Sequence, residues 1–200
     1  MFITLEGLDG SGKTTVLETL KSQLPKLTDR EIVITREPGG SPMAEKLRQL
    51  FLHDEAISPI TESLMVASGR ADHVDKVIKP AIERGALVIS DRFFDSSVAY
   101  QGGARGAGFN QVLQINLWAV QNVMPDLTFF IDTKPSVSIS RIDPDPDRLE
   151  SFGLELQTKA RIAYNKLFTM YPDRYIVFPV GMTLAEISQQ ILKILHEKLA

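Results

Sequence analysis

A glycine-rich stretch near the N-terminus has the residue types and the spacing of a phosphate-binding loop. Residues 7–14 read Gly-Leu-Asp-Gly-Ser-Gly-Lys-Thr, which fits the P-loop pattern GxxxxGK[ST]. A β-branched apolar run precedes the stretch and a helix-like segment follows it, which is the context that the motif requires. Backbone N–H groups of such a loop point at phosphate oxygens, Lys13 reaches the β- and γ-phosphates, and Thr14 faces Mg²⁺. We therefore predict a site for a nucleoside triphosphate; the alternative is a tight glycine turn with a chance lysine.

The residues expected to hold the nucleotide belong to this loop and to the first helical turn behind it. They are Gly7, Gly10, Ser11, Gly12, Lys13, Thr14 and Thr15. P-loops occur in motors, GTPases and small-molecule kinases, so the motif alone predicts a ligand and not a reaction. A Ras-type GTPase would need Asp-x-x-Gly after a strand and Asn-Lys-x-Asp for guanine. In this chain Phe94 and Phe168 occupy the positions of the required Gly and Asp, so that class is excluded.

Two arginines follow other predicted strands and could form a second anion site. Arg36 opens the stretch Arg-Glu-Pro-Gly-Gly behind the second strand, and Arg92 follows the third. The carboxyl ends of neighbouring parallel strands meet at one edge of a sheet, so these two side chains could jointly clamp a phosphate facing the γ-phosphate. The alternative is that each arginine forms a solvated ion pair with its neighbour, Glu37 or Asp91.

The elements that must position these residues alternate between strand-like and helix-like segments. Short runs rich in β-branched and aromatic residues lie at 2–6, 32–35, 86–90, 127–132 and 175–178. Longer segments with helix signals lie at 13–24, 43–52, 58–84, 110–123, 149–170 and 183–199. This alternation predicts an α/β fold of the P-loop NTPase type, in which a parallel five-stranded sheet carries helices on both faces and a short lid.

Composition limits the class of protein and its partners. The 200 residues are 44% hydrophobic, lack cysteine and carry a formal net charge of -3, which fits one globular domain and excludes disordered and disulfide-built classes. That charge favours small-molecule partners and gives no overall attraction to nucleic acid. The N-terminal residues do not resemble a signal peptide, and the longest uncharged run, 106–125, contains six Asn and Gln residues. We expect a cytoplasmic protein without a membrane span.

Together the motifs resemble those of bacterial thymidylate kinases over nearly the whole chain. The P-loop is generic, but Arg-Glu-Pro-Gly-Gly combined with Ala-Tyr-Gln-Gly at 99–102 is close to a family signature. The other matching segments are 2–15, 91–92, 96–97 and Arg148 before Glu150. The resemblance implies a homodimer of single-domain subunits, residues 1–200 with a lid at about 141–150. It also implies that ATP and dTMP are the substrates, that dTDP is formed for dTTP biosynthesis and that Mg²⁺ is required.

The resemblance also implies roles for individual residues. Arg36 and Arg92 would bind the phosphate of dTMP, and Asp9 would lie near the sugar 3'-hydroxyl and the reacting phosphates. On the donor side, Arg141 would contact ATP and Arg148 would stabilise the transferring phosphoryl group, so that Lys13, Arg92, Arg148 and Asp9 form the catalytic set. Thr14 would face Mg²⁺, and Glu37 and Asp91 would hold the waters of that ion or orient the arginines. The alternative for Asp9 is a helix N-cap.

For the base, the resemblance points to Arg70, Ser97 and Gln101 as hydrogen-bonding partners of thymine. Tyr100 would crowd the position of a ribose 2'-hydroxyl. A glutamine amide suits a pyrimidine imide edge because it offers a donor and an acceptor together. The alternatives are that Tyr100 belongs to the core and that Gln101 is a turn residue.

The chain departs from the family pattern at three places, one of which is the adenine end near 178–182, where Pro-Val-Gly stands in place of the usual Asp-Ala pair. Position 66, where relatives often carry a phenylalanine that stacks on thymine, is Val66, so another side chain must supply stacking or the stacking is weaker. The lid is short and acidic, with aspartates at 143, 145 and 147. We assign no role to the three scattered histidines, and we leave Trp118 open between the core and a subunit interface.

Two other functions stay open at this point. Another nucleoside monophosphate kinase would share the fold and differ in its acceptor. A regulatory subunit that binds nucleotide without turnover would not need the acceptor residues Arg36, Arg92 and Gln101, so their presence argues against it.

Overall fold

The computed structural model describes residues 1–53, 57–141 and 152–199. Its centre is a five-stranded sheet in the order β2-β3-β1-β4-β5, and all neighbouring strands are parallel. The strands are β1 (Phe2–Gly7), β2 (Ile32–Arg36), β3 (Leu87–Asp91), β4 (Leu127–Ile131) and β5 (Tyr175–Phe178). Each lies within one or two residues of its predicted position, and the predicted fold class is confirmed.

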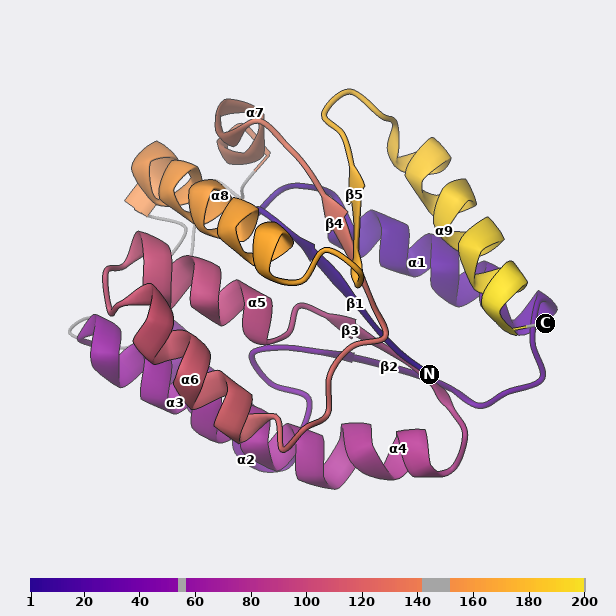
Figure 1. Ribbon diagram of the computed structural model, residues 1–200, viewed down its shortest axis with the longest axis horizontal. Coiled ribbons are helices and arrows are strands. Elements are labelled where there is room, and N and C mark those ends of the chain that lie inside the picture. The colour runs from indigo at the N-terminus through magenta and orange to yellow at the C-terminus, as the bar shows by residue number, and fades with distance from the viewer. Residues whose placement is uncertain (54–56, 142–151, 200) are drawn as a thin grey trace.

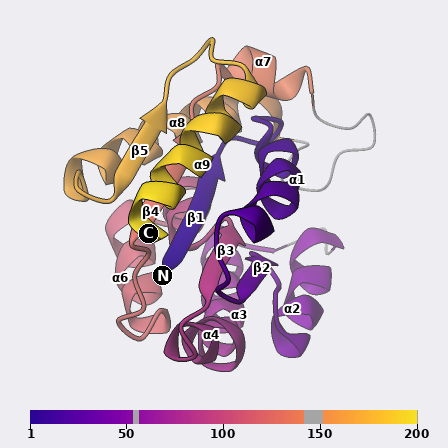
Figure 2. The ribbon, with the colours of Figure 1, turned by 90° about the vertical axis from the view of Figure 1, so that its right-hand side faces the viewer.

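Helices cover both faces of the sheet (Figures 1 and 2). One face packs against α1 (Lys13–Gln23) and α9 (Leu184–Leu199) through an apolar cluster that includes Leu20 and Ile191. The other face packs against α6 (Phe109–Ala119) and α8 (Gly153–Met170) through a cluster that includes Phe93 and Tyr164. Strands buried on both faces lack polar alternation, which explains their apolar sequences.

The remaining helices cover the rest of the sheet and its edges. They are α2 (Pro42–His53), α3 (Pro59–His73), α4 (Lys79–Glu83), α5 (Phe94–Ser97) and α7 (Pro135–Ile139). The single helix expected at 58–84 is α3 and α4 joined by a π-helical segment, Val74–Ile78. None of the helices within the described ranges is both long and apolar enough to cross a membrane.

The helical region at 94–104 was not predicted from the sequence. After α5 the chain continues as a π-helical segment, Val98–Ala104, which contains the Ala-Tyr-Gln-Gly motif. Its two glycines look like a loop signal, but Gly103 faces α8 so closely that an added Cβ would lie 2.5 Å from the Cβ of Ala163. Packing against α8 and α6 therefore overrides the low helix propensity of this stretch.

The strand register brings the chemistry-bearing segments together. Leu5 pairs with Asp91, and Arg36 also pairs with Asp91 from the other side. The carboxyl ends of β1, β2 and β3 therefore meet at one edge, where the P-loop, Arg36 and Arg92 all begin. The predicted juxtaposition of the two arginine-bearing strand ends is present.

Candidate active site

The P-loop connects β1 directly to α1. Gly10 has φ 68°, and an added Cβ there would lie 2.5 Å from the carbonyl oxygen of Ser138, so both the turn and its close neighbour require glycine. The side chain of Lys13 is buried and folds back over the loop, with Nζ 3.2 Å from the carbonyl oxygen of Gly7 and 2.9 Å from that of Leu8. Burial and the nearby Arg92 lower the pKa of Lys13 to about 8.

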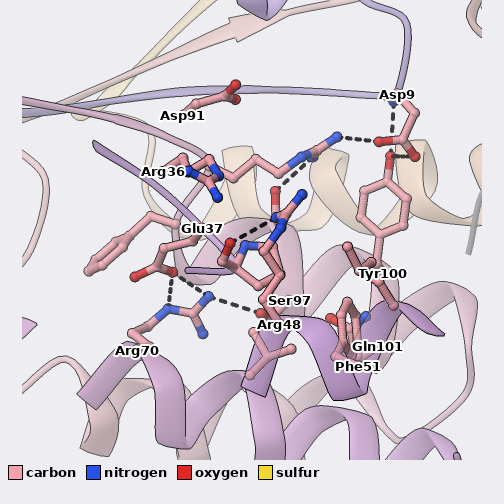
Figure 3. A pocket seen from close by; sticks show the side chains of 16 residues that line it. Asp9, Arg36, Glu37, Arg48, Phe51, Arg70, Asp91, Ser97, Tyr100 and Gln101 are labelled. Carbon is pink, nitrogen blue, oxygen red and sulfur yellow. Dashed lines mark hydrogen bonds and ion pairs between the residues drawn. The ribbon is translucent and has the colours of Figure 1, made fainter. Parts of the chain in front are cut away.

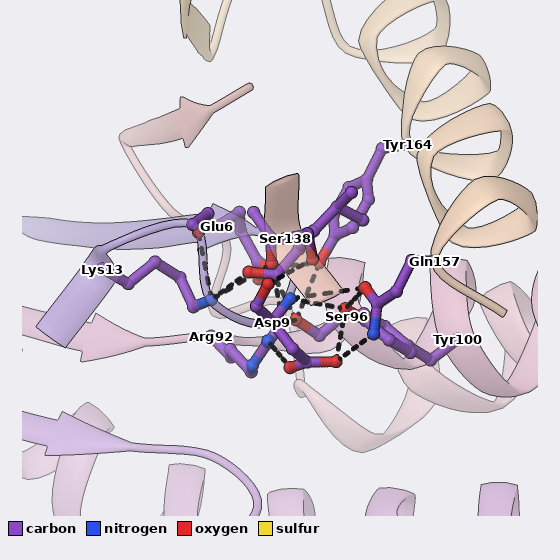
Figure 4. Close-up of polar contacts among 12 residues, drawn as sticks. Glu6, Asp9, Lys13, Arg92, Ser96, Tyr100, Ser138, Gln157 and Tyr164 are labelled. Atoms are coloured by element: carbon purple, nitrogen blue, oxygen red, sulfur yellow. Dashed lines mark hydrogen bonds and ion pairs between the residues drawn. The ribbon is translucent and has the colours of Figure 1, made fainter. Parts of the chain in front are cut away.

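Asp9 projects from the P-loop toward the acceptor side, where it is hydrogen-bonded by three side chains (Figure 4). Arg92 forms an ion pair with Oδ1. The hydroxyl of Tyr100 lies 2.9 Å from Oδ2, and Nε2 of Gln157 lies 2.7 Å from the same oxygen. Burial acts to raise the pKa of Asp9, but Arg92 and Lys13 outweigh it, so that the pKa lies below its ordinary value. Asp9 is therefore a carboxylate at neutral pH.

Arg92 connects the third strand to the P-loop. It has φ 68°, an uncommon backbone conformation for a side chain of this size. Its guanidinium donates to the carbonyl oxygen of Gly7 at 3.0 Å and to the hydroxyl of Ser96 at 2.9 Å, besides its ion pair with Asp9. The strained backbone thus directs a cation to the boundary between the donor loop and the acceptor side.

A cavity of about 240 Å³ lies beside this boundary. Figure 3 shows Asp9 and Tyr100 at one end of it and Glu37 and Arg70 at the other. Every acceptor-side residue predicted from the sequence lines it. These residues are Asp9, Arg36, Val66, Arg70, Arg92, Ser97, Tyr100 and Gln101.

Arg70 is fully buried and held from several directions. Its Nε lies 2.7 Å from Oε2 of Glu37, and one terminal nitrogen lies 3.0 Å from the hydroxyl of Ser97. The other terminal nitrogen donates to the side chain of Asn116. A guanidinium fixed in this way has no freedom to change rotamer, so its position in the cavity wall is set before any ligand binds.

Arg36 is more open. Its side chain is 52% exposed and forms an ion pair with Glu45 at 2.9 Å. The alternative ion pair of Arg36 with Glu37 is not found among the described residues, because Glu37 turns inward to Arg70 and His73. An exposed pair of this kind contributes less than about 1 kcal/mol, so a phosphate can displace it at little cost.

Comparisons with other proteins identify the family of the chain. The family model described as thymidylate kinase matches residues 5–191. A thymidylate kinase of Lactobacillus acidophilus is 40% identical over 204 aligned positions, which cover 99% of this chain and 94% of that protein. This chain belongs to the thymidylate kinase family. A second relative, the thymidylate kinase of Latilactobacillus sakei, is 41% identical over 201 positions, covering 98% and 94% of the two chains.

The fold of the family is also shared. The crystal structure of thymidylate kinase from Ehrlichia chaffeensis superposes with a TM-score of 0.80 at 32% identity, covering 98% of this chain and 97% of that one. The resemblance seen in the sequence is therefore confirmed, and the chain is a phosphotransferase enzyme. The regulatory-subunit alternative is not favoured.

The donor side of this family member is an open groove along the P-loop. Gly10, Gly12, Lys13, Thr14 and Thr15 line it, together with Arg141 and Leu184. The guanidinium of Arg141 lies 3.5 Å from the carbonyl oxygen of Gly10, which places this predicted ATP-contacting residue beside the loop. Arg148, predicted to act on the transferring phosphoryl group, lies outside the described residues.

The residues predicted to hold Mg²⁺ differ in how they are engaged. Oδ1 of Asp91 is buried and has no hydrogen-bond partner within the described ranges, and Asp91 lines the acceptor cavity. Both carboxylate oxygens of Glu37, in contrast, are taken up by Arg70 and His73. Among the described residues, no group of three carboxylate or imidazole side chains is arranged so that it could hold a metal ion. The donor set fits an ion held by one or two protein oxygens, substrate phosphates and water, as is usual for Mg²⁺.

Several residues of the site were missed from the sequence. Gln157 and Ser138 contact Asp9 from α8 and α7, and Arg48 and Phe51 line the cavity from α2. His73, to which no role was assigned, contacts Glu37 at 2.9 Å. None of these residues belongs to a recognisable motif. The signal that could have pointed to Gln157 and His73 is a polar residue at a position where the helical pattern places the apolar, core-facing side.

Proposed function

We propose that this chain transfers the γ-phosphoryl group of ATP to dTMP and forms dTDP, with Mg²⁺. The observation that carries the proposal is the position of Arg92. It touches the P-loop at Gly7 and lines the acceptor cavity, so one cation faces both phosphate groups that must meet. The finer roles below rest on this placement and on the family membership of the chain.

In the proposed reaction, an oxygen of the dTMP phosphate attacks the γ-phosphorus of ATP. The new O–P bond forms as the bond between the γ-phosphorus and the β,γ-bridging oxygen breaks, and ADP leaves. The second pKa of a phosphate monoester is about 6, so the nucleophile is largely dianionic at neutral pH and needs no general base. The protein must instead bring two anions together in line.

Each basic residue has a separate place in this step. Lys13 and the backbone N–H groups of the loop hold the donor phosphates, whereas Arg36 and Arg92 hold the acceptor phosphate. Arg148 neutralises charge on the transferring group, and Arg141 binds the adenosine part of ATP. Thr14 and Asp91 are the residues that would hold Mg²⁺, which supplies further charge neutralisation when bound. Glu37 has the role of orienting Arg70 in place of a direct metal contact.

The far end of the cavity is proposed to bind thymine. Gln101 offers a donor and an acceptor to the imide edge of the base, and Arg70 and Ser97 supply donors to its carbonyl oxygens. Val66 forms part of the apolar wall. Tyr100 crowds the 2' position of the sugar, and Asp9 accepts a hydrogen bond from the 3'-hydroxyl.

An ADP-release assay across dTMP, dUMP, dGMP and UMP tests the proposal. We expect dTMP to be preferred, dUMP to be slower and UMP to be poor. The missing methyl of dUMP is worth about 1–3 kcal/mol in an apolar pocket, so dUMP should be turned over measurably. Equal kcat/KM for dTMP and UMP, or a preference for dGMP, would overturn the proposed acceptor.

We also propose that the protein is cytoplasmic and that each subunit is one domain with a lid at about 141–150. Two subunits would form a homodimer through α3 and α6. These two helices pack against each other and leave large apolar side chains outside: Trp118 is 85% exposed, Ile60 63% and Leu64 52%. Exposure of this size excludes the core placement of Trp118. A second copy would cover the patch. Light scattering should give a dimer for the wild type and a monomer for Trp118→Arg; a monomeric wild type would refute the interface.

A further inference from the structure

A glutamine of α8 reaches across to the P-loop. The side chain of Gln157 is fully buried, and its Nε2 donates to Oδ2 of Asp9 at 2.7 Å. Its Oε1 lies 3.0 Å from the hydroxyl of Tyr100 and 3.4 Å from the backbone nitrogen of Asp9. Figure 4 shows the three side chains converging from α8, the P-loop and the segment Val98–Ala104.

The chemistry of this triangle suits an amide. An ionised carboxylate only accepts hydrogen bonds, so the group facing Oδ2 of Asp9 must donate. The group facing the backbone N–H of Asp9 must accept, and the hydroxyl of Tyr100, which can donate or accept, is compatible with an acceptor there. The amide of glutamine meets both requirements at once, and it does so without having to take up a proton, as a carboxyl group of the same length would.

Gln157 therefore completes the restraint on two acceptor-site residues. Oδ1 of Asp9 is held by Arg92, and Gln157 together with Tyr100 holds Oδ2. The ring of Tyr100 packs against the Arg92 guanidinium, 5.3 Å from ring centroid to Cζ, so its inner face is set by Arg92 and its hydroxyl end by Asp9 and Gln157.

We propose that Gln157 is a positioning residue that sets the Asp9 carboxylate and the Tyr100 ring, and through them the selection of a deoxyribose acceptor. This inference rests on the proposed function, since it assumes that dTMP occupies the cavity beside Tyr100. Gln157 does not line that cavity, so its effect on the sugar passes through the two residues that do.

The first test compares two acceptors that differ only at the 2' position, dTMP and 5-methyluridine 5'-monophosphate. We expect Gln157→Ala to lower the ratio of kcat/KM for dTMP to kcat/KM for the ribonucleotide at least tenfold, because the Tyr100 hydroxyl loses its contact with Oε1 and Oδ2 of Asp9 loses the amide donor. The matched control is Asn165→Ala, which removes an exposed amide from the same helix and should leave the ratio unchanged.

A merely structural role for Gln157 would lower the melting temperature of Gln157→Ala and leave the acceptor ratio within twofold of the wild type, which would overturn the proposal. The wild-type measurement keeps the two proposals apart. If the unmodified enzyme does not use dTMP, the proposed function fails whatever the variants do; if it does and the ratio is insensitive to residue 157, only the present inference fails.

The second test uses Gln157→Glu, which keeps the size of the side chain. Two adjacent carboxylates cannot both ionise easily, so one of the pair takes up a proton at a raised pKa. The other charged and titratable groups facing the pair are Arg92, Lys13 and the Tyr100 hydroxyl. A protonated Glu at 157 can donate to Asp9 and accept from Tyr100, as the amide does.

In this variant the ratio of kcat/KM for dTMP to kcat/KM for 5-methyluridine 5'-monophosphate should approach the wild-type ratio at about pH 5.5 and fall as the pH rises to about 8. The wild-type ratio should not change over this range. A pH profile of the ratio parallel to that of the wild type would overturn the proposal. This measurement is decisive even if Gln157→Ala fails to fold, because the isosteric variant keeps the packing of α8.

Discussion

The imidazole of His73 holds one carboxylate oxygen of Glu37 while Arg70 holds the other. Nδ1 of His73 lies 2.9 Å from Oε1, and Nε of Arg70 lies 2.7 Å from Oε2. The second ring nitrogen of His73 lies 2.7 Å from the hydroxyl of Thr35 on β2, which fixes the plane of the ring. A chain of buried contacts thus runs from β2 to the guanidinium in the cavity wall, and it explains why Arg70 can be buried without a large penalty.

Replacing His73 should weaken both stability and acceptor binding. We expect His73→Ala to lower the free energy of unfolding by about 1–3 kcal/mol, because Glu37 and Thr35 lose a buried partner, and to raise KM for dTMP. Urea denaturation and steady-state kinetics measure the two effects. His196→Ala, at an exposed histidine of α9, is the control. A stability loss with unchanged KM would show that Arg70 keeps its position without the imidazole.

Phe51 is expected to supply the aromatic contact that Val66 lacks. Both side chains are buried and line the cavity, Phe51 from α2 and Val66 from α3. Phe51→Leu should therefore weaken dTMP binding by about 0.5–1.5 kcal/mol, measured by calorimetry. In the Phe51→Leu background, Val66→Phe should recover part of that affinity. In the wild-type background, Val66→Phe would overpack the wall and lower the melting temperature.

If Phe51→Leu leaves the affinity for dTMP unchanged, the ring belongs to the core between α2 and α3 and not to the base site.

Lys13 should be needed for turnover and not for acceptor binding. Its Nζ contacts loop carbonyl oxygens and its side chain lines the donor groove, whereas it is absent from the described wall of the acceptor cavity. We expect Lys13→Ala to abolish phosphoryl transfer while dTMP still binds in calorimetry. Lys21→Ala, at an exposed position of α1, should change neither. A loss of dTMP affinity by more than about tenfold, or 1.4 kcal/mol, would mean that the two sites are not separate.

The two lid arginines should act unequally. We expect Arg148→Ala to lower kcat about 10³-fold with little change in KM for dTMP, as removal of an arginine finger does. Arg141 lies beside Gly10 in the donor groove, so Arg141→Ala should mainly raise KM for ATP. Retention by Arg148→Ala of more than about a tenth of the wild-type kcat, with chemistry rate-limiting, would move the transition-state role to Arg141.

Glu6 should make stability depend on pH. It is fully buried at the end of β1 and accepts hydrogen bonds from the backbone of Phe93 and from the hydroxyls of Ser96 and Tyr164. Burial, followed by the charge of Asp95, raises its pKa from 4.5 to about 7. A folded-state pKa above the unfolded value means that stability is lost as the pH rises from about 4.5 through 7, by up to about 3 kcal/mol.

Glu6→Gln should remove this dependence. The stability of the variant relative to the wild type, that is, its free energy of unfolding minus that of the wild type, should be larger at pH 7.5 than at pH 5, as measured by urea denaturation. Glu155→Gln, at an exposed side chain of α8, should follow the wild-type curve. Curves for Glu6→Gln and wild type that stay parallel over this range would show that Glu6 is ionised in the folded state throughout.

Most of the fold was predictable because each strand is short, apolar and bounded by turn or helix signals. The segment 94–104 was not, since its glycines match a loop and become helical only against α8. The short helix α7 was also missed; five residues carry too little periodicity to be recognised. Its Ser138 nevertheless donates to the backbone oxygen of Asp9.

The sequence by itself was enough to predict the P-loop, the five strands and most of the helices along the chain, the two arginines at strand ends and the family. These features are encoded in residues adjacent along the chain, where spacing and local propensity suffice. Only the tertiary structure decided that Glu37 turns to Arg70 and His73, that Trp118 lies on the surface and that Gln157 holds Asp9. Gln157 and Asp9 are 148 positions apart, and hydrogen bonds between such residues depend on how α8 packs over the sheet, which no local pattern records.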